Sequence, residues 1–138
     1  MDKEITTNDY QLPPSDLLNE YIPESKVPEN EIASKVAAIR SVLESGKVRV
    51  KEIKPMPGPV VTLYKVYPER GAKASKVRLL LEDAALDLQL KGARVIALKD
   101  SIGIEIANDH RASVPIRSVL NDDAFRNSKA EQPVAIGR

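Results

Sequence analysis

The spacing of apolar residues alternates between a helical and an extended period along the chain, and this alternation limits the folds open to it. Ile32, Val36, Ile39 and Leu43 recur at steps of four, three and four, which places them on one stripe of a helix that begins at Glu29. Further along, short β-branched runs alternate with one long helical pattern. The predicted elements after the first helix are strands 47–54 and 60–67, a helix 75–90, and strands 93–98 and 103–107.

The order helix, strand, strand, helix, strand, strand predicts an α+β fold, with two helices packed on a small, mostly antiparallel sheet. The proline-rich run 55–59 is interpreted as a break between the first two strands, because proline donates no ladder hydrogen bond. Residues 1–28 are predicted to be a flexible N-terminal arm and residues 29–138 a single domain. Within the C-terminal part we expect a strand end passing into a helical turn at 114–120, a short helix starting at 121–123, and a last strand at 134–136.

The second predicted helix carries apolar residues on two opposite faces. A broad face contains Val77, Leu80, Leu81, Ala84, Ala85 and Leu88. Leu79, Leu86 and Leu90 form a narrow stripe on the other side, although a surface helix normally needs only one apolar face. Either the helix is enclosed by its own domain, or the stripe contacts another domain or subunit.

The formal net charge of +1 conceals a basic middle segment. Residues 47–99 hold twelve Lys or Arg against five Asp or Glu, a net +7. Such a segment is either an ordinary solvated surface or an attractor of nucleic-acid phosphates. Lys73, Lys76 and Arg78 are the predicted nucleic-acid-binding residues, because they lie at or near the start of the second helix.

Several kinds of catalytic site have no support in the sequence. The chain has no cysteine and one histidine, His110, so disulfides, thiolate zinc sites and cysteine nucleophiles are excluded. The phosphate loop of glycine, four residues, Gly-Lys and Ser or Thr does not occur. We therefore predict no catalytic or metal-binding residue. A hydrolase that uses Asp83 and Asp87 as acid and base is the weakest alternative.

Seven segments in a fixed order resemble the region just upstream of the motor core in DNA translocases of the FtsK/SpoIIIE family. Each is short, but together they cover nearly the whole chain from residue 10. The segments are Tyr10–Leu18, Pro57–Tyr64, Gly71–Lys76, Leu79–Leu86, Ile102–Asn108, Val114–Leu120 and Pro133–Gly137.

The resemblance implies a role for the chain. In that family this module, the α domain, packs beside a RecA-like ATPase domain, and the two layers form a hexameric ring around duplex DNA. ATP and magnesium act in the second layer, so no cofactor is expected in this chain. Chromosome segregation, cell division, sporulation or transfer of mobile elements are the implied processes. The implied location is cytoplasmic, with a tether of the parent protein to the inner membrane supplied by another region.

The chain departs from the family pattern at two places. The run Leu98-Lys-Asp-Ser101 stands where the family usually has a Pro-Gly-Lys loop, and Ala107-Asn108 stands where it has Pro-Asn. The shortened loop puts any contact made by that loop in doubt. We expect an excised α domain that contributes ring assembly and a basic surface near DNA. The alternative is a standalone protein-binding adaptor that has lost its motor.

Overall fold

The computed structural model describes residues 11–21, 26–87 and 93–136, which fall into two compact units. Unit 1 combines the two ends of the chain, residues 1–22 and 114–138, and unit 2 comprises residues 23–113. The predicted boundary between an arm and a single domain at residue 28 stays a prediction.

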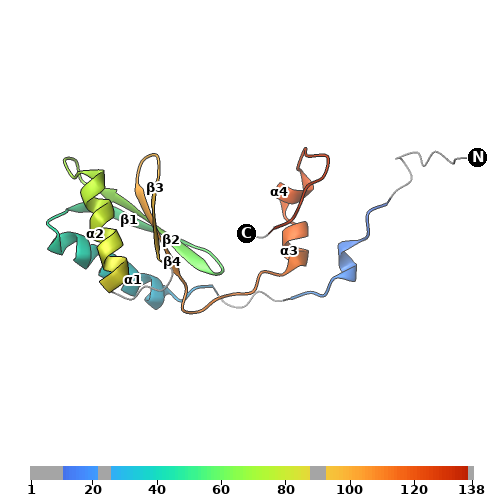
Figure 1. The fold of residues 1–138 in the computed structure, drawn as a ribbon. Helices are drawn as coiled ribbons and strands as arrows, with labels where there is room; N and C mark the ends of the chain where they lie inside the picture. The colour runs from blue at the N-terminus through green and yellow to red at the C-terminus, as the bar shows by residue number, and fades with distance from the viewer. Residues whose placement is uncertain (1–10, 22–25, 88–92, 137–138) are drawn as a thin grey trace, which may run out of the picture. The chain divides into compact units, whose positions relative to one another are not determined.

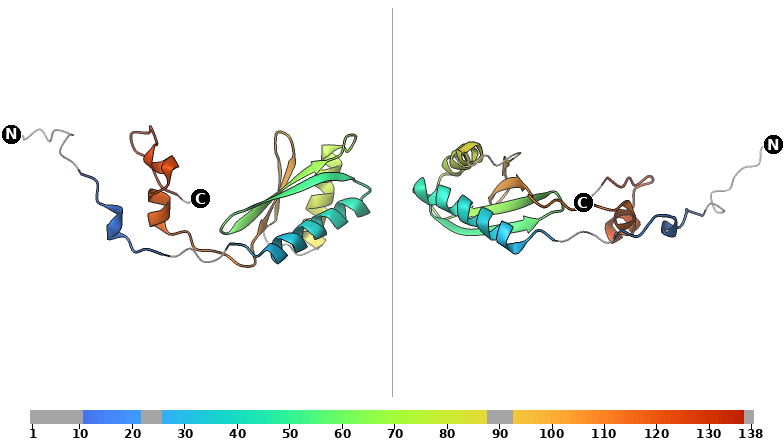
Figure 2. Two further views of the ribbon diagram at one scale, coloured as in Figure 1. Left: turned by 180° about the vertical axis from the view of Figure 1, so that it is seen from behind. Right: turned by 90° about the horizontal axis from the view of Figure 1, so that it is seen from below.

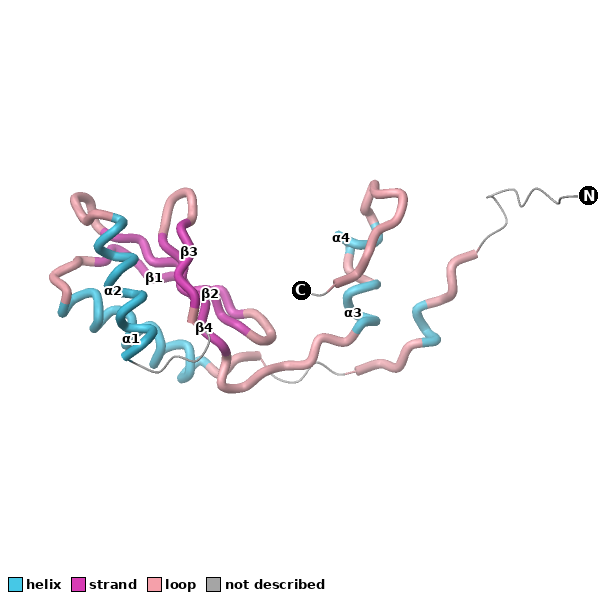
Figure 3. Tube along the Cα trace, viewed as in Figure 1, coloured by secondary structure: helices cyan, strands magenta, loops and turns pink. Residues whose placement is uncertain are grey.

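Unit 2 contains the two long helices and the sheet (Figures 1 and 3). The elements of unit 2 are α1 (Glu29–Ser45), β1 (Val50–Pro57), β2 (Val61–Pro68), α2 (Ala74–Asp87), β3 (Arg94–Ala97) and β4 (Ile102–Ala107). Helix α1 begins after Pro28, whose fixed φ suits the residue before a first helical turn, and ends at Ser45.

The four strands form one antiparallel sheet in the order β1-β2-β4-β3. Tyr64 of β2 lies opposite both Pro55 of β1 and Ile104 of β4. Because residues that lie opposite share a face, this register sends one set of side chains towards the helices. The predicted α+β class, with two helices and a small antiparallel sheet in that order, is confirmed.

Helices α1 and α2 pack against each other and on the same face of the sheet (Figure 2). The core between them is aliphatic apart from Tyr64, as few aromatic residues are available. Leu43, Val66, Val77 and Leu81 have no exposed surface, and each such side chain contributes roughly 1.5–3 kcal/mol of burial free energy. The predicted inner faces of both helices are the ones that the structure buries as far as it describes them, and Leu88, the last residue of that face in the second helix, lies outside the described residues.

Two local predictions were wrong. Strand β1 runs through Pro55 to Pro57 instead of ending at Lys54, and it starts at Val50 instead of Lys47. Prolines fit there because β1 is an edge strand that pairs only with β2. The predicted strand 134–136 does not form; residues 133–136 have no regular secondary structure.

The described residues of unit 1 form short elements: a 3₁₀ turn (Ser15–Leu17), α3 (Ile116–Leu120) and α4 (Asp123–Arg126). The expected helical turn within 114–120 is confirmed, without a strand before it, and the short helix is confirmed with Asp122 as its N-cap. Arg117 joins the two ends of the chain, because its guanidinium donates to the Leu18 carbonyl at 3.0 Å and to Asp16 at 2.9 Å.

Across the described ranges of both units, every helix is too short or too polar to cross a membrane.

Candidate nucleic-acid interface

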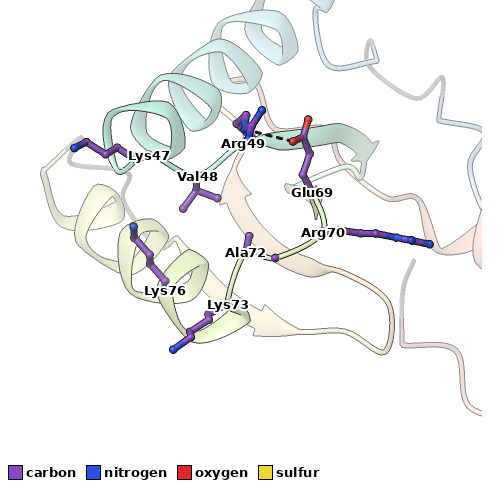
Figure 4. Close-up of a pocket in the computed structure, with 9 residues that line it drawn as sticks. Lys47, Val48, Arg49, Glu69, Arg70, Ala72, Lys73 and Lys76 are labelled. Carbon is purple, nitrogen blue, oxygen red and sulfur yellow. Dashed lines mark ion pairs between the residues drawn. The ribbon is translucent and has the colours of Figure 1, made fainter.

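A hollow of about 430 Å³ lies where the end of α1, the start of β1, the loop after β2 and the start of α2 meet (Figure 4). Its basic lining consists of Lys47, Arg49, Arg70, Lys73 and Lys76. In the view of Figure 4 the ammonium groups of Lys47, Lys73 and Lys76 extend to one side, and Arg70 extends to the other. Lys47, Lys73 and Lys76 together form the lysine face of the hollow.

Charge pairing differs among these cations. Arg49 lies 3.5 Å from Glu69, also at the hollow, and both side chains are exposed. No carboxylate within the described ranges comes within 4.0 Å of a lysine-face ammonium, nor of Arg70. Uncompensated cations grouped on one surface attract anions, above all the phosphates of a nucleic acid.

The structure places the sequence-predicted basic residues in two settings. Lys73 and Lys76 line the hollow. Arg78 is not among its lining residues and donates to Glu82 one helical turn on, at 2.7 Å. Residues two apart on a helix do not face the same side, which separates Arg78 from Lys76.

Lys47 reaches the hollow through an unusual helix end. The Lys47 amide donates to the Glu44 carbonyl at 2.9 Å and the Val48 amide to the Leu43 carbonyl at 2.8 Å, the two bonds of a Schellman motif. That motif places Lys47 at a left-handed position with φ of 57°. Gly46, one residue earlier, has φ of −77°, and a Cβ there would require the end of the Leu80 side chain to shift.

The second predicted site, the outer leucine stripe of α2, lies away from the core. Leu79 is 59% exposed and Leu86 is 79% exposed, whereas Leu81 on the inner face is fully buried. Leu90, the third residue of that prediction, lies outside the described residues. No described part of the chain encloses Leu79 or Leu86, although their role as a contact stays a prediction.

Sequence reasoning missed a polar cluster where α1 begins and β4 ends. The buried Glu31 carboxylate accepts from the Asp109 amide at 2.8 Å and from Lys35 Nζ at 3.0 Å, and lies 3.1 Å from His110 Nδ1. Lys35 also donates to the Ala107 carbonyl at 3.0 Å. Only the spacing of Glu31 and Lys35, one helical turn apart, was visible in the sequence.

The pKa of Glu31 reflects this cluster. Burial would raise the pKa of this carboxyl, but the hydrogen bonds from Asp109, His110 and Lys35, with the charge of Lys35, outweigh it and lower the pKa to about 2. Glu31 is thus held as a carboxylate that joins the two ends of unit 2. Its bonds are all used within the fold, which makes it a structural group.

The residues do not fit ATP or its metal. The sequence lacks a phosphate loop, and only one glycine, Gly71, stands in the loop between β2 and α2. Within the described ranges no three His, Asp or Glu side chains come close enough to hold a metal ion. Asp83 is exposed, and the side chain of Asp87 lies outside the described part, so the hydrolase alternative gains no support.

Comparisons with known proteins agree on one family. The FtsK alpha domain model matches residues 12–108. The chain is 39% identical over 131 residues to the DNA translocase FtsK of Haemophilus influenzae, covering 92% of this chain and 25% of that protein. It is 38% identical over 135 residues to that of Oceanobacillus iheyensis (95% and 17%), and 36% identical over 141 residues to that of Agrobacterium fabrum (97% and 16%). The chain thus spans a quarter or less of the length of these relatives.

Proposed function

The chain belongs to the FtsK alpha domain family, and on that premise we propose that it is the non-catalytic α domain of an ATP-driven translocase of double-stranded DNA. The parent motor is a homo-hexameric ring that uses ATP and magnesium in its RecA-like ATPase domain. Its work is chromosome segregation at cell division or transfer of mobile DNA. The α domain contributes ring assembly and a basic surface near the DNA.

The observation that carries the DNA-proximal role is the hollow beside α2. Lys73 and Lys76 come from the same helix start, and Lys47 joins them from a segment 26 residues earlier in the chain. Contacts of ammonium groups with phosphates are independent of base sequence, which suits a motor that moves along DNA of any sequence. One module binds weakly, with a Kd on the order of 10⁻⁴ to 10⁻⁶ M, and a ring multiplies such contacts.

Charge reversal at the hollow tests this role. We expect the Lys73→Glu, Lys76→Glu double variant to lower the affinity for a mixed-sequence duplex, measured by fluorescence anisotropy across a salt series. The slope of log K against log salt should fall by about 1.8, which corresponds to two lost phosphate contacts. Arg78→Glu is measured separately, because Arg78 is paired with Glu82 outside the hollow.

A matched double variant, Lys99→Glu with Lys129→Glu, changes the net charge equally at exposed residues that do not line the hollow. It should retain most of the affinity and the full slope. Equal losses of affinity in the two double variants would mean that DNA binding depends only on the net charge of the chain, and the proposed surface would then be wrong.

The outer leucines of α2 support a contact with protein. Leu79 and Leu86 remain exposed, and each would gain roughly 1.5–3 kcal/mol on burial. In the motor, the proposed partner is the ATPase domain or a neighbouring subunit. The same exposure favours the second candidate function, a standalone adaptor, because an adaptor also needs an apolar face for its partner.

A further inference from the structure

The backbone at Lys47 is in a conformation that glycine adopts far more readily than lysine. Its φ of 57° lies in the left-handed region, and the position is the one where helices that end in this motif usually place glycine. A side chain at that φ brings Cβ close to the following carbonyl oxygen, which is unfavourable for every L-residue with a Cβ. The fold therefore carries a lysine at a position where glycine would be more stable.

Packing does not account for the lysine. The side chain of Lys47 is exposed, and no carboxylate in the described ranges lies within ion-pair distance of its ammonium. At the adjacent Gly46 a Cβ would meet the end of the Leu80 side chain, which would have to shift. Among the described residues, the Lys47 side chain lines the hollow together with Lys73 and Lys76.

We propose that Lys47 is a phosphate-binding residue, placed at the end of α1 at a cost in stability so that its ammonium joins Lys73 and Lys76 against the backbone of duplex DNA. This inference rests on the proposed function and adds a residue to it. Strained backbone positions persist where the surrounding structure fixes them, and they are frequent at binding sites. Lys47 fits that description, since two Schellman hydrogen bonds fix its backbone.

The variant Lys47→Gly separates stability from binding, because the proposal predicts opposite changes in the two. In the full 138-residue chain we expect the midpoint of thermal unfolding to rise by about 4 °C as the strain is removed. The affinity for a mixed-sequence duplex at low salt should fall about fivefold, and the salt slope should fall by about 0.9, which is one phosphate contact. Lys47→Arg keeps both the charge and the strain, so it should retain the affinity and the melting temperature.

Lys129→Gly is the matched control, since it removes one exposed charge outside the hollow and should leave affinity and slope unchanged. An unchanged affinity in Lys47→Gly would overturn the binding role of Lys47, and an unchanged or lower melting temperature would overturn the stability cost. If Lys73→Glu, Lys76→Glu loses affinity while Lys47→Gly does not, only this inference fails. If neither variant changes binding, the proposed DNA surface fails with it.

Discussion

Replacing Glu31 by glutamine should destabilise unit 2 strongly at neutral pH. The carboxylate is buried and accepts hydrogen bonds from the Asp109 amide, 78 residues away in the chain, and from Lys35 Nζ. Glutamine keeps the shape and one acceptor oxygen but loses the charge. Its Nε2 replaces Oε2, the oxygen that faces His110 Nδ1, and the largely buried Lys35 ammonium keeps only a neutral oxygen as its partner on residue 31.

Two estimates of the loss agree. Hydrogen bonds to a charged group contribute roughly 1.5–3 kcal/mol each, and Lys35 keeps a second partner in Asp109 at 3.2 Å, so the net loss is about 2 kcal/mol. A fall in pKa from 4.5 to about 2 corresponds to at most ~3.4 kcal/mol at 1.36 kcal/mol per unit. Solvent reaches the cluster through the exposed Asp109 and His110, and this screening lowers the figure to about 2 kcal/mol.

The pH dependence has a definite sign. The folded-state pKa of Glu31 lies below the unfolded value, so its contribution is complete above about pH 4.5 and is lost as the pH falls towards 2. The difference in unfolding free energy between wild type and Glu31→Gln should therefore be largest at pH 7. By pH 3 it should narrow to less than about half of that value.

Urea unfolding at pH 7, 4 and 3 measures this difference, with Glu44→Gln as the control. Glu44 lies on the same helix but is exposed, so its replacement should change stability by less than about 0.5 kcal/mol at every pH. A difference in unfolding free energy between wild type and Glu31→Gln that stays constant from pH 7 to pH 3 would refute the assignment of the lowered pKa to this carboxyl. A difference below about 0.5 kcal/mol at pH 7 would show that the cluster does not stabilise the fold.

Two further substitutions test the sheet end and the outer face of α2. Asn108→Ala should lower the unfolding free energy by about 2–3 kcal/mol in urea melts, because the buried Asn108 side chain accepts from Thr62 at 2.7 Å and donates to the Gly58 carbonyl at 2.7 Å. Asn108→Asp should cost at least as much at pH 7, because it places a buried carboxylate oxygen against the Gly58 carbonyl. Leu86→Glu should change the melting temperature little, since Leu86 is 79% exposed, but should weaken ring assembly in the full motor, measured by sedimentation. Leu81→Glu places a charge on the buried face of the same helix and should unfold the chain. A comparable loss of stability in Leu86→Glu would exclude the outer leucines of α2 as a contact with another domain or subunit.

The long-period features of the fold were predictable from the sequence because they repeat. Ile39 and Leu43 are buried as the helical spacing of α1 requires, and Val77, Leu81 and Ala84 mark the inner face of α2. The ordered motifs also identified the family, and the comparisons confirm it. Periodicity succeeds here because residues at the helical spacing lie on the same side of the helix, so a whole series of them faces either the core or the solvent.

Single residues were harder to predict, since their roles depend on distant partners. The sequence around Glu31 did not indicate that its carboxylate would accept a hydrogen bond from the Asp109 amide. Pro55 and Pro57 signalled a break, and only the position of β1 at the sheet edge makes them acceptable in a strand. Glycine is the residue type expected at a left-handed helix end, but in α1 the left-handed residue is Lys47, one position after Gly46.

The two ends of the sheet in unit 2 differ in chemistry and in chain connections. Glu31 and Asn108 lie where the chain enters α1 and leaves β4, and their hydrogen bonds fix that end internally. The lysine face lies at the other end, beyond the last residues of α1 and β2, where the chain only turns from one element to the next. The proposed phosphate contacts therefore belong to the end of the sheet opposite to Glu31 and Asn108, the end that the fold does not fix through its own buried hydrogen bonds.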